Sequence, residues 1–505
     1  MNTALVVNSI RRGLYVDSVA LMRISTEITA LPGVEEASLM IGSESNKHIL
    51  EEAGLLAEPG RDAGPDDLII ALRVQDQDTA DSALAVVAAS LMHAPDKTRG
   101  ASEWRPRTLD AAIAVLATAN LVLISVPGEF AASEAAKALR RGLHVMMFSD
   151  NVPIAQERAL KHLAKARGLL MMGPDCGTAL LSGTPLGFAN EVSRGDIGAI
   201  AASGTGLQEF SVLVARGGDG LSHGIGVGGR DLSDEIGGIT TLMAIDALEE
   251  DRTTGHIVLI SKPPGPATAR IVLARLAQCQ KPVTVCFLGL EGDVTLPKNV
   301  TRADTLRAAA TRALRHGHEP ESPMSARQVE EVSATLGAGR RWIVGLYTGG
   351  SLCAEAQVLL RAARLPFQAN APIPGARPLE QQTGASHTLL DLGADEYTIG
   401  RPHPMIEPAV RNDVLAKTLQ RSDVAVVLLD VVLGYGAHPD PAGAVAQTIA
   451  QSNASRPLII ASVCGTDADP QGYARQVQKL AQAGVIVTES NAEAAELAVR
   501  VVQSV

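Results

Sequence analysis

The sequence predicts an α/β protein made of parallel sheets flanked by helices, with a small α+β domain at its N-terminus. Short apolar runs alternate with amphipathic segments along most of the 505 residues, which is typical of strand–helix–strand units. Aromatic residues make up only 3% of the chain, which favours close-packed α/β layers over aromatic-rich sandwiches. The order of predicted strands and turns in residues 192–315 recurs in residues 341–505, so we expect two copies of one unit.

The composition also argues against several classes of function. A net charge of −11 leaves no basic face for a nucleic acid or an anionic membrane. The chain has neither a leader-like N-terminus nor an apolar run of about 18 residues, so we expect a cytoplasmic protein. The five cysteines are scattered without a C-x-x-C pair, so we expect no metal site and no disulfide framework.

Residues 1–93 are predicted to form the small α+β domain, of the ferredoxin-like kind. Apolar runs predict its strands and amphipathic segments predict its helices; the strands are at 4–10, 36–42 and 67–74, and the helices at 17–31, 44–55 and 79–91. Arg11, Arg12 and Gly13 could contact a ligand, although a solvated loop explains them as well. The polar, proline-containing residues 94–108 predict a linker.

Residues 109–191 are predicted to form a Rossmann-like domain. Its predicted strands are at 121–126, 144–148 and 169–172, with a helix at 132–141. Ligands of parallel sheets bind beyond the carboxyl ends of the strands. The turns at 126–128, 149–151 and 173–177 fall at such ends.

Residues 192–315 are predicted to form a flavodoxin-like domain that opens on a Gly-rich turn. A strand at 197–202 runs into Ser203, Gly204, Thr205 and Gly206, and a helix continues through 215. Such a turn presents free N–H groups, hydroxyls and a positive helix end, which together can bind an anion. The alternative is an ordinary turn capped by Ser203. Further strands are predicted at 225–227, 256–261 and 283–288.

Residues 341–505 are predicted to form a second flavodoxin-like domain. A strand at 343–347 is followed by the turn Thr348, Gly349, Gly350 and Ser351 and then by a helix at 352–363. The later strands correspond in order and chemistry to those of the first copy; they are at 389–392, 424–429 and 456–461. About 20 additional residues separate the first two strands of this copy. If the two sheet edges face one another, both turns aim helix N-termini at one anion.

Several motifs resemble known proteins. The segments 173–177, 197–207 and 226–229 resemble, in order, the α subunit of succinyl-CoA synthetase. The segments 347–352 and 389–393 resemble the C-terminal domain of its β subunit. Nearly the whole chain, including the segments 148–151, 228–232 and 400–405, is similar to the FdrA family of acyl-CoA-synthetase-like proteins. This resemblance implies a CoA-binding-type domain at 109–191 and ligase-type domains at 192–315 and 341–505.

The resemblance implies an anion site but departs from a complete ligase. In succinyl-CoA synthetases two helix N-termini clamp a phosphohistidine. The resemblance therefore implies phosphate binding at the corresponding turns, 203–206 and 348–351. Here the corresponding loop at 288–293 has no histidine, the Gly-rich first turn of the CoA-binding domain has no clear counterpart before Leu121, and the chain shows neither an ATP-grasp domain nor a P-loop. These departures make a ligase that works alone a poor interpretation.

FdrA-family members are implicated, with companion proteins, in oxamate carbamoyl transfer during allantoin breakdown. We therefore expect a carbamoyltransferase subunit that binds carbamoyl phosphate and an oxamate-like acid, acting with companion subunits in an oligomer. One alternative is a subunit of a nucleotide-dependent acyl-CoA synthetase, for which CoA would be a cofactor. Another is a scaffold or ligand-sensing subunit without catalysis.

Four further side chains are candidates for the chemistry. Arg230 and Arg401 could bind phosphate or carboxylate through a bidentate guanidinium, unless they form salt bridges. His403 stands between two prolines and His438 follows a predicted strand. Either could act as a general acid or base, or be a structural histidine in a rigid turn.

Two other residues have a structural alternative. Asp430 interrupts an apolar run, so it needs a partner if it is buried, although it could equally cap a loop. Cys176 could be a nucleophile, but no neighbour in the sequence activates it, and packing explains it better.

Overall fold

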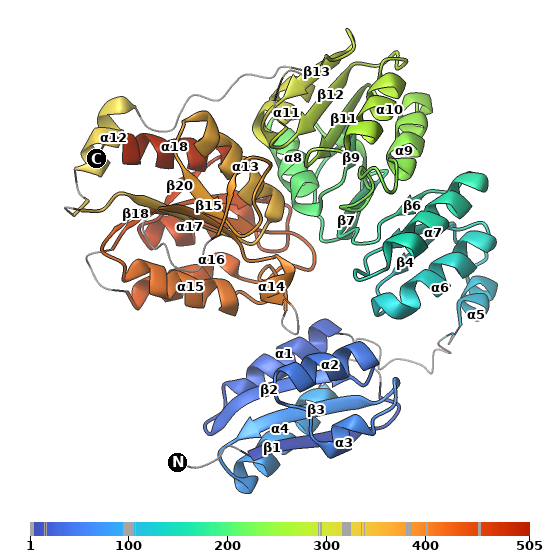
Figure 1. Cartoon of the computed structure of the whole chain (residues 1–505), viewed down its shortest axis with the longest axis vertical. Coiled ribbons are helices and arrows are strands. Elements are labelled where there is room, and N and C mark those ends of the chain that lie inside the picture. The colour runs from blue at the N-terminus through green and yellow to red at the C-terminus, as the bar shows by residue number, and fades with distance from the viewer. Residues whose placement is uncertain are drawn as a thin grey trace. The chain divides into compact units, whose positions relative to one another are not determined.

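The computed structural model describes residues 5–14, 16, 18–93, 106, 108–290, 292, 295–315, 325–334, 336–337, 339–379, 386–398, 402–452 and 456–504 (Figure 1). The chain divides into two compact units. One comprises Met1–Trp104 with Asp395–Glu407, and the other comprises Arg105–Ala394 with Pro408–Val505. The predicted linker at 94–108 lies almost entirely outside the described residues.

The first unit contains a three-stranded antiparallel sheet in the order β1-β3-β2. Its central strand is an apolar run with alternate residues in two cores, so helices must cover both faces. The elements are β1 (Leu5–Arg11), α1 (Ser18–Thr29), β2 (Val34–Ile41), α2 (Glu44–Glu52), α3 (Glu58–Arg61), β3 (Leu68–Val74) and α4 (Gln77–His93). Apart from the short α3, each was predicted from the sequence.

The second unit begins with a parallel sheet in the order β4-β5-β6. Its elements are α5 (Leu109–Val115), β4 (Leu121–Ile124), α6 (Gly128–Arg140), β5 (His144–Met147), α7 (Ile154–Ala166) and β6 (Met171–Met172). The loops after the three strands meet at their carboxyl ends, where Ser149 Oγ donates to the carbonyl of Val126 and Asp175 N donates to that of Ser149. This is the edge at which the sequence places ligands.

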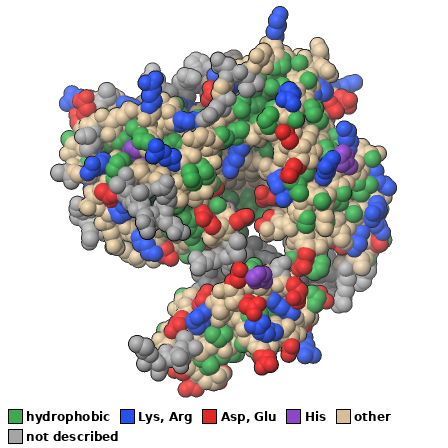
Figure 2. Space-filling view, in the orientation of Figure 1, with side chains coloured by type: hydrophobic (Ala, Val, Ile, Leu, Met, Phe, Trp, Pro, Cys, Tyr) green, Lys and Arg blue, Asp and Glu red, His purple; other side chains and the backbone are tan. Residues whose placement is uncertain are grey.

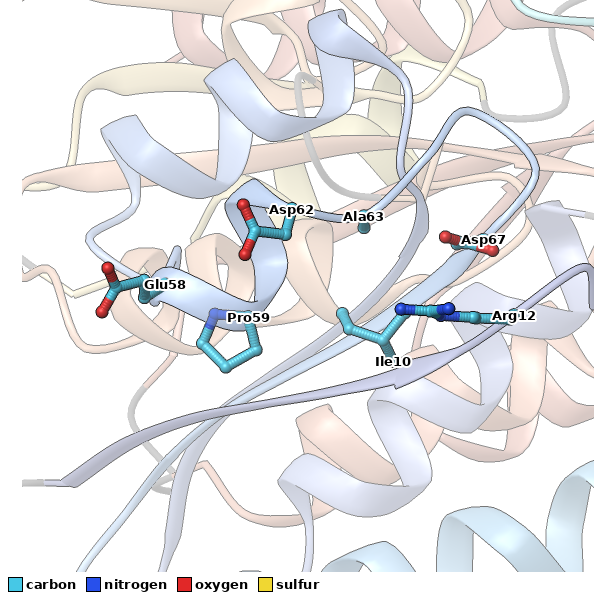
Figure 3. A pocket seen from close by; sticks show the side chains of 7 residues that line it. All are labelled: Ile10, Arg12, Glu58, Pro59, Asp62, Ala63 and Asp67. Carbon is cyan, nitrogen blue, oxygen red and sulfur yellow. The ribbon is translucent and has the colours of Figure 1, made fainter.

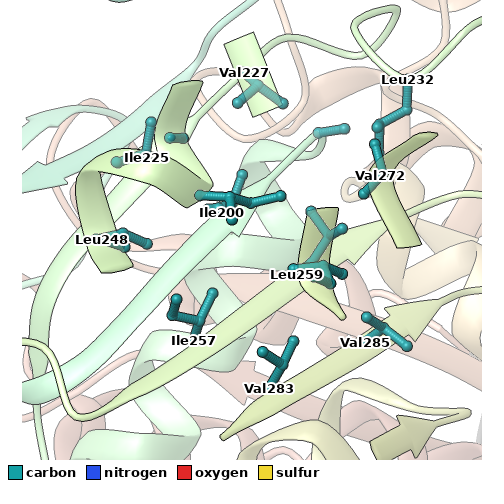
Figure 4. Close-up of a cluster of buried hydrophobic side chains, with 14 of the residues drawn as sticks. Ile200, Ile225, Val227, Leu232, Leu248, Ile257, Leu259, Val272, Val283 and Val285 are labelled. Atoms are coloured by element: carbon teal, nitrogen blue, oxygen red, sulfur yellow. The ribbon is translucent and has the colours of Figure 1, made fainter. Parts of the chain in front are cut away.

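A seven-stranded sheet follows, in the order β13-β12-β11-β9-β10-β7-β8. Its strands are β7 (Thr178–Leu181), β8 (Thr184–Gly187), β9 (Arg194–Ala201), β10 (Leu221–Gly226), β11 (His256–Ser261), β12 (Val283–Phe287) and β13 (Val300–Ala303). The helices are α8 (Gly204–Arg216), α9 (Ile239–Glu250), α10 (Pro266–Leu276) and α11 (Leu306–Ala313). The strands β9 to β13 are parallel, and aliphatic side chains such as Ile200, Ile257 and Leu259 fill the core beside them (Figure 4).

The hairpin β7–β8 extends this sheet through β10. Our predicted boundary at 191/192 assigns the hairpin to the preceding domain. The hairpin was missed because its strands have four residues each, too few for a periodic pattern.

A second seven-stranded sheet has the order β16-β15-β17-β14-β18-β19-β20, with every pair parallel. Its strands are β14 (Trp342–Tyr347), β15 (Phe367–Ala369), β16 (Arg377–Pro378), β17 (His387–Asp391), β18 (Val424–Val432), β19 (Leu458–Cys464) and β20 (Ile486–Thr488). The helices are α12 (Ala326–Ser333), α13 (Gly350–Ala362), α15 (Ala409–Leu419), α16 (Pro441–Ala450), α17 (Tyr473–Gln482) and α18 (Asn491–Gln503), while α14 (Asp395–Thr398) belongs to the first unit.

The two large sheets repeat one topology. The order β10-β9-β11-β12-β13 in the first equals β17-β14-β18-β19-β20 in the second, which is the flavodoxin-like order. The additional residues of the second copy contain β15 and β16 at the sheet edge. Helices α8 and α11 of one copy contact α13 and α18 of the other. The predicted α/β fold with its two flavodoxin-like repeats is therefore confirmed.

The distribution of charged side chains on the visible surface (Figure 2) is consistent with the net charge of −11. On the face that Figure 2 shows, basic side chains are interspersed with acidic ones instead of forming one continuous patch. Within the described ranges, no helix has both the length and the apolar character that crossing a membrane requires.

Candidate functional site

The structure brings the two Gly-rich turns together. Helix α8 begins directly after β9 and α13 begins directly after β14, so both N-termini lie at carboxyl ends of strands. Ser203 Oγ is 2.5 Å from Ser351 Oγ. A Cβ atom at Gly349 would lie 3.0 Å from Cγ2 of Thr205. Phosphate binding at this junction stays a prediction, but the two turns proposed for it are neighbours.

The α8 turn keeps backbone donors available. Ser203 caps the helix because its Oγ accepts the N–H of Gly206 at 3.1 Å. Among the described residues, the N–H groups of Ser203 and Gly204 have no acceptor, and both residues are only half-buried. Free N–H groups at a positive helix end can bind an anion.

The α13 turn differs because it faces a carboxylate of the protein itself. Asp430 in β18 is fully buried, and its Oδ1 and Oδ2 accept the N–H of Thr348 at 2.8 and 3.0 Å. Its Oδ2 also accepts the N–H of Gly349 at 2.7 Å, and its Oδ1 accepts the Thr348 hydroxyl at 3.1 Å. Burial raises the pKa of Asp430, whereas these donors and the charge of Arg411 lower it.

The prediction that both turns present free donors is therefore wrong for Thr348 and Gly349, whose N–H groups already bind Asp430. A second carboxylate adjoins the same turn, since a Cβ atom at Gly350 would lie 2.7 Å from Asp391 Oδ2. The two halves of the predicted clamp are chemically unequal.

Two further acids lie behind the turns, at equivalent positions of α8 and α13. Glu355 is fully buried and accepts the N–H of Leu306 at 2.6 Å and the side-chain amide of Asn491 at 2.7 Å. Glu209, also buried, accepts the N–H of Asn491 at 3.1 Å. Burial and then the charge of Glu209 raise the pKa of Glu355 to about 7. Burial likewise raises the pKa of Glu209.

The sequence analysis missed Glu355. One available signal was that each helix carries a glutamate at the same distance from its N-cap residue, Ser203 or Gly349. Acids at matched positions of two repeats whose helices meet are expected to come close together.

Arg230 forms a salt bridge, which the sequence analysis gave as the alternative to phosphate binding. Its Nη2 is 2.8 Å from Oε2 of Glu157 and donates to the carbonyl of Val152 at 2.7 Å. Glu157 also lies 3.2 Å from Nζ of Lys161, which contacts Asp231 at 2.6 Å. Arg230 thus ties the loop after β10 to α7, and within the described residues it contacts neither of the two Gly-rich turns.

The candidate acid–base groups also take structural positions. The Nδ1 of His403 accepts the N–H of Met405 at 3.2 Å, and burial lowers the pKa of His403 to about 4. His403 belongs to the segment Asp395–Glu407 of the first unit, and Arg401 lies outside the described residues. The Nδ1 of His438 accepts the N–H of Asp440 at 3.0 Å in the turn before α16.

The cysteines give no nucleophile. All five are buried, and burial raises the pKa of Cys176 to about 12, so its thiol stays protonated at neutral pH. Among the described residues, no group of three His, Cys, Asp or Glu side chains could hold a metal ion.

The edge of the β4-β5-β6 sheet offers a second set of backbone donors. Helices α6 and α7 begin after Pro127 and Pro153, and neither N-terminus has a side-chain cap. Uncapped N–H groups at a helix N-terminus can bind phosphate groups.

The first unit has a cavity of about 420 Å³. Its lining combines one guanidinium with three carboxylates (Figure 3): Ile10, Arg12, Glu58, Pro59, Asp62, Ala63 and Asp67. Asp67 accepts the N–H groups of Gly64 at 2.9 Å and Gly13 at 3.0 Å, which lower its pKa. These bonds shape the loop that the sequence analysis left open as a ligand contact or a solvated turn.

Comparison with known proteins decides the family. The chain is 41% identical to the uncharacterized protein YahF of Escherichia coli over 97% of both chains. A CoA-ligase family model matches residues 346–501, and a model described as "AllF, heavy metal-associated domain" matches residues 2–106. The chain belongs to the FdrA-like family of acyl-CoA-synthetase-like proteins.

Part of the FdrA-like chain also resembles subunits of CoA ligases. It is 27% identical to the succinate–CoA ligase α subunit of Methanothermobacter thermautotrophicus, over 34% of this chain and 57% of that subunit. It is 24% identical to the sulfoacetate–CoA ligase subunit SauD of Bilophila wadsworthia, over 34% of this chain and 59% of that subunit. The chain therefore spans less than two thirds of these relatives. A solved acetyl-CoA synthetase from Ca. Korarchaeum cryptofilum matches 76% of this chain and 82% of its own at 16% identity and a TM-score of 0.33.

The residues matched to the heavy metal-associated model offer a soft metal no thiolate ligand. Residues 2–106 contain no cysteine, and thiolates are the ligands that soft metals prefer. The first cysteine of the FdrA-like chain is Cys176, which is buried in the second unit.

Proposed function

We propose that the FdrA-like chain is a subunit of a nucleotide-dependent acyl-CoA synthetase whose nucleotide-binding part is a companion chain. The observation that carries this proposal is the contact between Ser203 and Ser351, which joins the N-termini of α8 and α13 across two flavodoxin-like domains. The CoA-ligase family match and the ligase subunits among the relatives support it and favour it over carbamoyl transfer.

In this proposal, α8 holds the phosphoryl group of an acyl phosphate. The N–H groups of Ser203 and Gly204 and the hydroxyl of Thr205 would bind its oxygens, which stabilises phosphate as a leaving group. An anion between the two turns must replace the hydrogen bond between Ser203 and Ser351. CoA would supply the acceptor thiol, and the uncapped starts of α6 and α7 would hold its phosphates.

The test uses the chain together with the proteins that co-purify with it. We expect ATP hydrolysis that requires both CoA and a short carboxylic acid, measured as ADP or AMP release across a panel of acids. Ser203→Ala should reduce the rate about tenfold, because the hydroxyl that caps α8 through the N–H of Gly206 and orders the turn is lost. Ser43→Ala, which removes the N-cap of α2 in the first unit, is the matched control. No CoA-dependent turnover with any acid would contradict the proposal.

Carbamoyl transfer is the second candidate, and the loop at 288–293 favours it. This loop has no histidine, so it cannot relay a phosphoryl group as the resembling synthetases do, whereas carbamoyl phosphate arrives already activated. Incubation with carbamoyl phosphate and oxamate, without nucleotide, tests this candidate. Phosphate release that requires oxamate would support it, and no release would remove it. Ligand-dependent assembly without turnover in either assay would indicate a scaffold.

A further inference from the structure

The two repeats differ at one matched position beside the turns. In the first repeat, the last paired residues of β9 and β11 are Ala201 and Ile260, and Ser261 follows. In the second, the last paired residues of β14 and β18 are Leu346 and Leu429, and Asp430 follows. The same place in the fold therefore holds a hydroxyl beside α8 and a carboxylate beside α13.

Asp430 occupies the place that an anion would take at α13. It accepts the N–H groups of Thr348 and Gly349 and the hydroxyl of Thr348 from inside the protein. Behind it, the buried Arg411 donates to the carbonyl of Asp430 at 2.9 Å. A carboxylate with these donors satisfies the helix end as a bound anion would.

Among the residues that the structure describes, no carboxylate accepts the N–H groups of Ser203 and Gly204 in the α8 turn. Ser203 Oγ bonds Gly206 N, whereas the N–H groups of Ser203 and Gly204 find no acceptor in the described part of the chain. Asp391 adds a second buried carboxylate on the α13 side only. Charge and hydrogen bonding both make α8 the better half for an anion.

We propose that Asp430 is a built-in anion that closes the α13 turn, so that the FdrA-like chain binds one phosphate, at α8. Asp430 is a specificity-determining residue: it confines the ligand to a single anionic end and sets its orientation, because a second negative group would face Asp430 and Asp391. This inference rests on the proposed phosphate binding at α8.

Calorimetric titration of the full chain with inorganic phosphate tests the inference. Wild type should bind one phosphate. Asp430→Asn should bind a second phosphate, or bind phosphate about tenfold more tightly, because a helix end with the buried Arg411 nearby is then without its counter-ion. Asp440→Asn is the matched control, since Asp440 also caps a helix, α16, through the N–H of Gly443 at 3.2 Å. It should bind phosphate as wild type does.

A reciprocal variant covers the case in which Asp430→Asn does not fold. Ser261→Asp places a carboxylate beside α8, where it should weaken phosphate binding about tenfold by occupying the N–H groups. Circular dichroism checks the fold of each variant. A folded Asp430→Asn or Ser261→Asp protein that binds phosphate as wild type does would overturn the inference.

The same titration separates the inference from the proposed function. Phosphate binding by Asp430→Asn but not by wild type would remove the α8 site and support the role of Asp430. Binding by neither protein would overturn both.

Discussion

Single residues set the charge of the junction between the repeats, and the buried pair Glu209 and Glu355 is the clearest case. Each glutamate bonds Asn491, and two carboxylates in one buried place do not both ionise readily. The pKa of Glu355 is raised to about 7 by burial and by Glu209, while hydrogen bonds from Asn491 and Leu306 and the charge of Arg307 oppose the rise. Glu355 therefore keeps its proton in the folded state at a pH at which the unfolded chain has lost it.

This proton predicts how stability depends on pH. Between pH 4.5 and 7 the folded state binds more protons at Glu355 than the unfolded state, so wild type loses stability as the pH rises. Glu355→Gln cannot ionise and should gain roughly 1–3 kcal/mol relative to wild type between pH 5 and pH 8. Urea unfolding at both pH values measures this, with the exposed Glu331→Gln as control. A difference that is the same at both pH values would contradict the prediction.

His403 predicts that the stability of the fold decreases as the pH falls, which is the opposite of the dependence predicted for Glu355. Burial lowers its pKa to about 4, so the imidazole is neutral at pH 7. Its protonation should destabilise the fold as the pH falls from 6.5 towards 4. Nuclear magnetic resonance titration of the His403 ring should give a pKa below 5, and His403→Gln should weaken the acid-side loss of stability. A pKa near 6.5 would return His403 to the candidates for acid–base catalysis.

At the scale of elements, helix α7 is tied to the loop after β10 by buried charges. Lys161 contacts Asp231 at 2.6 Å, Glu157 at 3.2 Å and the carbonyl of Val227 at 3.0 Å. Asp231 also accepts the N–H groups of Thr240 and Thr241 at the start of α9. Lys161 therefore connects the β4-β5-β6 domain to the first flavodoxin-like repeat.

Removal of this lysine should be costly. Lys161→Met leaves the buried Asp231 without its cation and removes one of the two cations beside Glu157, so it should lower the free energy of unfolding by about 3–5 kcal/mol. Lys165→Met, at an exposed position of the same helix, should change it by less than about 0.5 kcal/mol. Urea denaturation measures both. Equal effects of the two substitutions would show that the buried network does not hold these elements together.

At the scale of the whole molecule, the chain combines a heavy metal-associated type of domain with a CoA-ligase type of repeat. Residues 2–106 contain no cysteine, so we expect this domain to carry no soft metal. The full chain, exposed to Cu(I) or Zn²⁺ and washed with a mild chelator, should retain far less than one equivalent by elemental analysis. Stoichiometric retained metal would contradict this expectation.

The elements were predictable because their signals are local. Strand β11 at His256–Ser261 has the predicted bounds, since an uninterrupted apolar run marks a strand covered on both faces. The hairpin β7–β8 and helix α7 are among the elements that were not predicted. The strands of the hairpin are too short to show a periodic hydrophobic pattern. Helix α7 carries charged residues on its buried face, Glu157 and Lys161, and these interrupt the apolar stripe that would mark the helix in the sequence.

The sequence by itself determined the α/β class, the internal repeat and the two Gly-rich turns, because periodicity and glycines after strands act over a few residues. Only the tertiary structure decided that the turns are unequal. Thr348 and Asp430 are 82 positions apart and meet because β18 lies beside β14. Glu209 and Asn491 are 282 positions apart and meet where the repeats pack together. Contacts over such separations depend on which strands pair and which helices face one another, and no local pattern records that.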